Sequence, residues 1–125
     1  MTITQVSGNS FADRAGVKAG DKIVGYKKQS SGNFSVEQND QAFKDFIQSC
    51  QKGEKIDLLI ERNGIQFQAT VERNVYTETY VRYVDASGSY GFLGEGENIT
   101  FEKIEGLKKR ISDIKKQIRN LQFLR

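Results

Sequence analysis

The chain has 125 residues, of which 37% are hydrophobic and 28% charged, as expected for one globular domain with at most one appendage. It contains no histidine and a single cysteine, Cys50, which excludes His-based zinc sites and triads, thiolate metal clusters and any internal disulfide. We therefore expect no catalytic residue, no metal site and no cofactor in this chain.

The charge is distributed unevenly. Residues 1–100 hold 11 Lys and Arg against 13 Asp and Glu, whereas residues 101–125 hold 8 against 3. The net charge of +3 thus comes from the C-terminal segment, and the nearly neutral body argues against nucleic acid as a partner. We expect a folded domain over 1–98 and a basic helix over 99–125.

The first half of the chain shows short strands and helices in alternation. The pattern predicts a strand, one helical turn, a second strand, a polar loop and a capped helix: Thr2–Val6, Phe11–Ala15, Lys22–Lys28, 29–38, and Asn39 or Asp40 to about Lys52. This last helix carries Phe43, Phe46, Ile47 and Cys50 at i, i+3, i+4 and i+7. The stripe is either core or the wall of a ligand groove, and Cys50 is expected to be a small buried residue.

The second half begins with the clearest local signal. Lys55–Arg62 and Ile65–Val71 flank Asn63-Gly64, whose residues tolerate the positive φ of a tight hairpin. Val75–Val84 is rich in Val, Thr and Tyr and predicts a further strand. Tyr90 to Leu93 forms a short apolar run, and the glycines after it indicate a break.

From residue 100 onward the pattern changes to one long amphipathic helix. Its apolar residues follow each other at spacings of 3, 4, 3, 4 and 3, an a/d heptad stripe: Ile104, Leu107, Ile111, Ile114, Ile118 and Leu121. The stripe favours self-association. Contact of the basic helix with an anionic membrane surface, and docking onto the chain's own body, are the alternatives.

Two stretches resemble bacterial PDZ domains. Asn9-Ser10-Phe11-Ala12 followed by Ala15-Gly16-Val17-Lys18-Ala19-Gly20-Asp21 is similar to the family's Ser-Pro-Ala turn, Ala-Gly-Leu and Gly-Asp signature. Phe43 to Ile47, Gly53 to Leu58 and Glu61-Arg62-Asn63-Gly64 look like its helix, strand and hairpin. The resemblance covers residues 2–73 and implies an α+β fold: a small antiparallel β-barrel or sandwich with two helices, followed here by the long amphipathic helix.

The position of Tyr90-Gly91-Phe92 indicates the branch of the family. This run resembles the peptide-carboxylate element of PDZ domains but follows the hairpin, a circularly shifted strand order similar to that of membrane-embedded site-2 zinc metalloproteases. The resemblance implies a non-catalytic module on the extracytoplasmic face of a bacterial membrane, within a larger protease that holds the zinc. HtrA-like and C-terminal-processing serine proteases are the alternative parents. The family's proline after Ser10 is absent, as is the zinc-binding His-Glu-x-x-His helix.

A domain of this kind binds an extended peptide as an added strand beside a helix. The predicted peptide site has a donor loop and edge strand, and an apolar wall on the helix: Ser89, Tyr90, Gly91, Phe92 and Leu93, with Phe43, Phe46 and Ile47. The alternatives are a groove that only filters substrates by size, and a structural adaptor that acts through the helix at 104–121.

Overall fold

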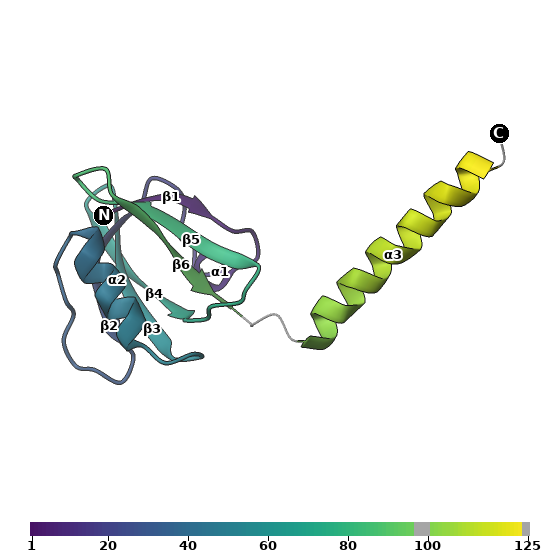
Figure 1. Cartoon of the computed structure of the whole chain (residues 1–125). Helices are drawn as coiled ribbons and strands as arrows, with labels where there is room; N and C mark the ends of the chain where they lie inside the picture. The colour runs from purple at the N-terminus through teal and green to yellow at the C-terminus, as the bar shows by residue number, and fades with distance from the viewer. Residues whose placement is uncertain (97–100, 124–125) are drawn as a thin grey trace.

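The computed structural model is an α+β protein with a six-stranded antiparallel sheet and three helices (Figure 1). It describes residues 1–96 and 101–123, with side-chain environments for residues 1–96 and 105–119. In chain order the elements are β1 (Thr2–Val6), α1 (Phe11–Arg14), β2 (Lys22–Lys28), α2 (Asp40–Ser49), β3 (Lys55–Arg62), β4 (Ile65–Glu72), β5 (Thr79–Val84), β6 (Tyr90–Glu95) and α3 (Phe101–Phe123).

Local signals account for most of these boundaries. Asn63 and Gly64 have φ of 52° and 78°, and β3 and β4 pair from Arg62–Ile65 outward, so the predicted hairpin is confirmed. The side chains of Ser10 and Asn39 accept hydrogen bonds from the backbone N–H groups of Asp13 and Ala42 and thereby cap α1 and α2.

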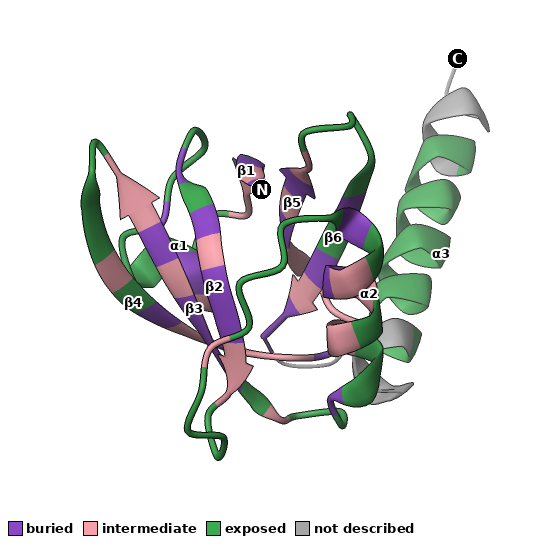
Figure 2. Ribbon diagram, turned by 90° about the vertical axis from the view of Figure 1, so that its left-hand side faces the viewer, coloured by how far each residue is buried: buried purple, intermediate pink, exposed green. Residues whose placement is uncertain are grey.

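The sheet has the order β4-β3-β2-β1-β5-β6, so β4 and β6 are its two edges. The chain beyond β4 returns to the end of β6, where Arg73 and Glu95 form a β-bridge. We call this contact between Glu72–Asn74 and Gly94–Gly96 the seam. Because the two edges meet at the seam, the sheet curls around the core, with β2, β3 and β4 on one side and β1, β5 and β6 on the other (Figure 2).

The core fills the space inside the curled sheet, and α2 covers its open side. Phe43 is completely buried and meets the rings of Tyr26 and Tyr83 edge-on, at centroid distances of 4.9 and 4.8 Å. Cys50 is buried as predicted, with its Sγ 3.3 Å from the carbonyl oxygen of Phe46. Burial raises the pKa of the Cys50 thiol, which keeps it protonated and unreactive.

Within residues 1–96, three boundaries differ from the predictions by more than one residue. Helix α2 ends at Ser49 because Cys50 takes an extended backbone conformation, with φ −82° and ψ 138°. Strand β5 begins at Thr79, four residues after Val75, because the preceding residues belong to the seam and the loop that follows it. Strand β6 continues through Gly94 to Glu95, since β5 pairs with it along its whole length.

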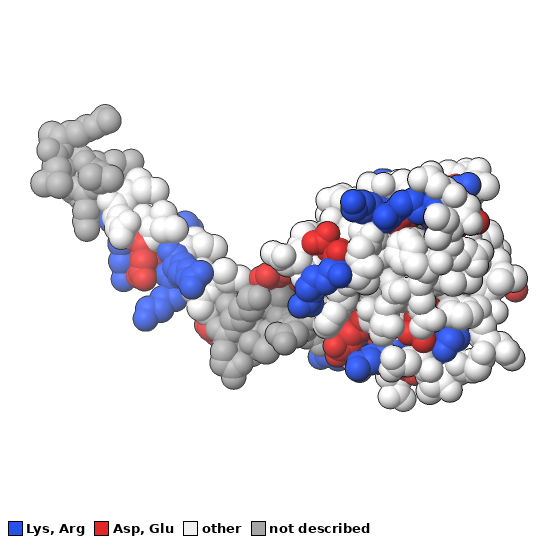
Figure 3. Space-filling view, turned by 180° about the vertical axis from the view of Figure 1, so that it is seen from behind, with Lys and Arg blue, Asp and Glu red and all other residues white. Residues whose placement is uncertain are grey.

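Helix α3 is separate in character from the body. All of its described side chains, residues 105–119, are exposed, and Lys and Arg predominate among its charges, whereas both signs are interspersed over the face of the body seen in Figure 3. The side chains of Ile104 and Leu121 lie outside the described residues. Within the described part of the chain, no helix combines the length and the apolar character needed to cross a membrane.

Candidate functional site

Strand β6 is the edge of the sheet that faces α2, and its register shows which of its backbone groups point outward. Tyr80 of β5 exchanges hydrogen bonds with Ser7 on the β1 side, and Gly94 lies opposite Tyr80. In an antiparallel pair such residues turn their N–H and C=O groups away from each other. The backbone groups of Tyr90, Phe92 and Gly94 therefore face the outer edge of the sheet.

The chain itself occupies the C-terminal half of this edge. The N–H of Asn74 donates to the carbonyl of Gly94 at 3.0 Å, and the N–H of Gly96 donates to that of Glu72 at 3.1 Å. A Cβ on Gly94 would lie 2.5 Å from the carbonyl oxygen of Asn74, so only glycine permits this approach. The edge predicted to be open is thus shortened to its N-terminal half.

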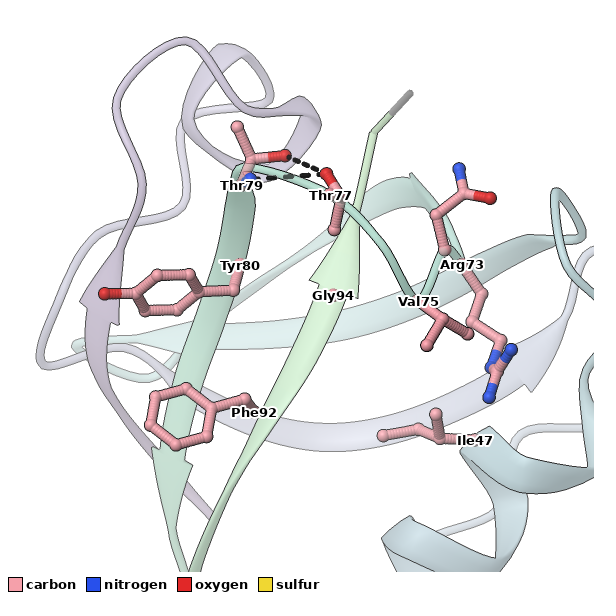
Figure 4. A pocket seen from close by; sticks show the side chains of 9 residues that line it. Ile47, Arg73, Val75, Thr77, Thr79, Tyr80, Phe92 and Gly94 are labelled. Atoms are coloured by element: carbon pink, nitrogen blue, oxygen red, sulfur yellow. Dashed lines mark hydrogen bonds between the residues drawn. The ribbon is translucent and has the colours of Figure 1, made fainter. Parts of the chain in front are cut away.

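A hollow of about 500 Å³ opens where the seam begins, between β6 and the C-terminal half of α2 (Figure 4). Tyr80 and Phe92 lie on one side of Gly94, and Val75 and Ile47 lie on the other. The remaining lining residues come from the seam and the loop before β5: Arg73, Asn74, Thr77 and Thr79. The hollow is large enough for one apolar side chain beside the backbone of Phe92.

The three predicted wall residues of α2 have different environments. Phe43 belongs to the core and has no exposed surface. Phe46 is half-buried and packs against Tyr26, with ring centroids 4.8 Å apart. Ile47 alone lines the hollow. The helical stripe therefore serves mainly as core, and its C-terminal end reaches the candidate site.

The predicted residues of β6 alternate between two faces. Leu93 is completely buried in the core, while Tyr90 and Phe92 are 55% and 54% exposed on the outer face. Phe92 packs edge-on against Tyr80 at 5.3 Å, and the guanidinium of Arg82 lies 4.6 Å from the ring centre of Tyr90. Phe92 thus lines the hollow and also contacts the rings of Tyr80 and Tyr90 on the outer face of the sheet.

The loop before β6 does not present free donors for a ligand carboxylate. Asp85 Oδ1 accepts hydrogen bonds from the N–H groups of Ser87 and Ser89, both at 3.0 Å, and Oδ2 accepts from the N–H of Asp40 at 2.8 Å. Hydrogen bonds from Ser87 and from the Asp40 backbone hold the pKa of Asp85 below its usual value. Of the run Ser89 to Phe92 predicted to bind a peptide terminus, the chain's own carboxylate thus uses the N–H of Ser89.

Asp40 fills the adjoining space between α2 and β6. Burial opposes ionisation of Asp40, but hydrogen bonds from Lys44, Ser89 and Tyr83 outweigh it and hold its pKa below the usual value. A Cβ on Gly91 would lie 3.2 Å from Asp40 Oδ1, so α2 packs directly on β6 at this end. Gly91 is therefore a buried packing residue, and Ser89, which donates its hydroxyl hydrogen bond to Asp40, is exposed together with Tyr90 and Phe92.

The residues that sequence reasoning missed are those of the seam and the loop after it. Arg73, Asn74, Val75 and Thr77 lie in a stretch whose second half was predicted as strand, and no local pattern distinguishes them. They line the hollow because Thr77 and Thr79 donate hydrogen bonds to the carbonyl of Glu95 and so hold the loop against β6.

Glu95, at the end of β6, belongs to the seam, and its acidic side chain is completely buried. Its Oε1 accepts a hydrogen bond from the N–H of Ala12 at 3.1 Å, and its Oε2 has no partner among the described residues. Burial raises the pKa of Glu95, with the Ala12 hydrogen bond acting against it. Folding therefore shifts the protonation equilibrium of Glu95 toward the neutral acid, compared with the unfolded chain.

The arrangement defines a small curled sheet with a short open edge and one apolar hollow beside a helix. Such a site suits recognition of an extended segment, since it combines unpaired backbone groups with a place for a side chain. Comparison with known proteins adds no relative: no family model, no curated protein and no solved structure matches the chain.

Proposed function

We propose that the chain is a non-catalytic, PDZ-like module that binds an extended segment of a protein substrate at the open part of β6. The backbone of Phe92 pairs with the segment, and one apolar side chain of the segment enters the hollow between Phe92, Val75 and Ile47. The observation that carries the proposal is the hollow of about 500 Å³ directly beside the unpaired edge groups of β6.

The biological setting of the proposal rests on the sequence resemblance. The Ser10 to Asp21 signature and the late position of Tyr90-Gly91-Phe92 favour a membrane-embedded zinc metalloprotease of the site-2 type as the parent protein. The module then meets substrates on the extracytoplasmic face of a bacterial membrane, and the zinc belongs to the parent. An HtrA-like or C-terminal-processing serine protease is the alternative parent.

The short edge indicates weak binding, so an NMR titration is the appropriate test. Blocked hexapeptides with a central leucine should shift the amide signals of Tyr90 and Phe92 and the methyl signals of Ile47 and Val75. Ile47→Ala removes one wall and should weaken binding about fivefold, the expected cost of losing one buried aliphatic contact. Ile65→Ala is the matched control, because Ile65 is 71% exposed on the distant hairpin.

The filtering alternative makes the opposite prediction. If the groove only excludes bulky folded substrates, no peptide shifts these signals at any concentration. Shifts confined to residues outside β6 and the hollow would also contradict the proposal.

Self-association through α3 is the second candidate function. The described residues of its apolar stripe are all exposed, although such a stripe is ordinarily covered: Leu107 at 43%, Ile111 at 54%, Ile114 at 55% and Ile118 at 51%. Sedimentation of the full chain should then give a larger assembly than the 1–98 fragment. If both are monomers, binding of the full chain, but not of the fragment, to anionic vesicles supports the membrane-surface alternative.

A further inference from the structure

Arg73 differs from the other arginines of the body in having an unsatisfied side chain. The Nε of Arg73 is buried and donates to no described residue, and no ion pair among the described residues involves it. Arg62, in contrast, forms two 2.7 Å bonds to the carboxylate of Asp21. A buried donor without a partner is costly, and native proteins seldom retain one without a reason.

The backbone of Arg73 holds this side chain at the hollow. Its N–H donates to the carbonyl of Glu54 at 2.9 Å, and its own carbonyl accepts from the N–H of Gly53 at 2.7 Å. The side chain then extends beside Val75 toward Ile47, and Arg73 lines the hollow (Figure 4). Arg73 therefore places a cation at the edge of an otherwise largely apolar recess.

We infer that Arg73 binds the side-chain carboxylate of an acidic residue in the recognised segment, next to the apolar residue that enters the hollow. The inference rests on the proposed function and names the class of segment it selects: internal, extended, with an aliphatic residue beside Asp or Glu. A guanidinium matches a carboxylate in a two-bond fork, and the terminal Nη groups of Arg73 are its reachable donors, because Nε itself is buried.

A side-chain carboxylate fits this place better than a chain end. A terminal carboxylate requires several convergent donors, and the neighbouring donors are already used. Asn74 donates to Gly94, and the hydroxyl groups of Thr77 and Thr79 both donate to the carbonyl of Glu95. Arg73 is the one charged donor among the residues that line the hollow.

The opposite end of β6 supports the same assignment. There Asp85 already saturates the N–H groups of Ser87, Ser89 and Asp40, and the Asp40 carboxylate lies beside it. A second carboxylate at that end would find the N–H of Ser89 already used and would face two acids held ionised, Asp40 and Asp85. An acidic residue of the ligand is therefore accepted only at the Arg73 end of the site.

The test is a double-mutant cycle on the full chain, measured by calorimetry. Two acetylated and amidated hexapeptides share a central leucine and differ by Glu or Gln beside it. The wild-type chain should bind the Glu peptide about tenfold more tightly, the expected effect of one charge-assisted contact. Arg73→Gln should reduce this preference to less than twofold, and Arg110→Gln on the exposed face of α3 should leave it unchanged.

Further measurements can also overturn the inference. In the wild-type chain the Nε–H signal of Arg73 should shift with the Glu peptide and stay in place with the Gln peptide, a readout that needs no variant. Equal affinity for the two peptides overturns the inference but leaves the proposed function standing. Absence of any binding overturns both. A free-acid peptide that binds tenfold more tightly than the blocked Glu peptide shows that Arg73 takes a chain end instead.

Discussion

The two ends of β6 perform different tasks within six residues. At Tyr90 and Phe92 the outward backbone groups are unpaired, and both side chains are exposed. At Gly94 and Glu95 the same strand is covered by the seam and reaches a completely buried acid. One edge strand thus closes the curled sheet at its C-terminal end and stays accessible at its N-terminal end. The hollow forms where the two ends meet.

The largest expected loss of stability comes from disrupting the seam at Gly94. Gly94→Ala places a methyl group 2.5 Å from the Asn74 carbonyl oxygen, and the contact is with backbone, which cannot yield locally. We expect the free energy of unfolding to fall by about 3 kcal/mol, the cost of an overpacked site, as measured by urea denaturation. Gly8→Ala is the control, because no atom lies within 4 Å of its added Cβ. Equal stability of the two variants would show that the seam is not tightly packed.

A smaller loss of stability is expected at the N-terminal end of β6. There the Asp85 carboxylate accepts hydrogen bonds from the N–H groups of the preceding loop. Asp85→Ala releases the N–H groups of Ser87, Ser89 and Asp40, so the urea midpoint should fall, by less than in Gly94→Ala. Asp85→Asn keeps one amide oxygen as an acceptor and should retain part of the stability. The released donors should also improve binding of a free-acid peptide relative to its amide. If the ratio of the affinities for the free-acid peptide and its amide is unchanged in Asp85→Ala, the role given to Asp85 is contradicted.

The smallest expected effect is a pH dependence at Glu95. Burial raises the pKa of Glu95 in the folded chain, so its contribution to stability is fully present below its ordinary pKa and is lost as the pH rises through the raised value. The wild-type chain should therefore lose stability relative to Glu95→Gln as the pH is raised from about 4 to 8. Urea unfolding at several pH values measures this difference, with Glu37→Gln, an exposed acid, as the control. If the free energies of unfolding of the wild-type chain and Glu95→Gln change with pH in parallel, this prediction is contradicted.

Most of the fold was predictable because its signals are local. Asn63-Gly64 selects a tight hairpin, Ser10 and Asn39 cap their helices, and β1 and β2 have the predicted bounds. The strand predicted from Val75 begins late because hydrogen bonds from Thr77 and Thr79 to the carbonyl of Glu95 hold the preceding loop against β6. These partners lie 18 and 16 residues apart, beyond the reach of a periodicity argument.

The candidate site was predictable only in outline. Of the residues predicted to bind a peptide, Phe92 and Ile47 line the hollow, whereas Phe43 and Leu93 follow the same apolar patterns and lie in the core. Spacing along a helix or strand identifies an apolar face, but it does not say whether another element covers that face. Helix α2 covers Phe43 against Tyr26 and Tyr83 and leaves Ile47 at the rim.

The sequence by itself determined the class of structure, the order of its elements and the absence of histidine chemistry, because composition, capping and turn preference act over a few residues. Only the tertiary structure decided which part of β6 is accessible, that Asp85 occupies the expected carboxylate loop, and that Arg73 reaches the hollow without a partner. These features depend on where the two edges of the sheet meet. That meeting is set by packing around the whole core rather than by any single segment.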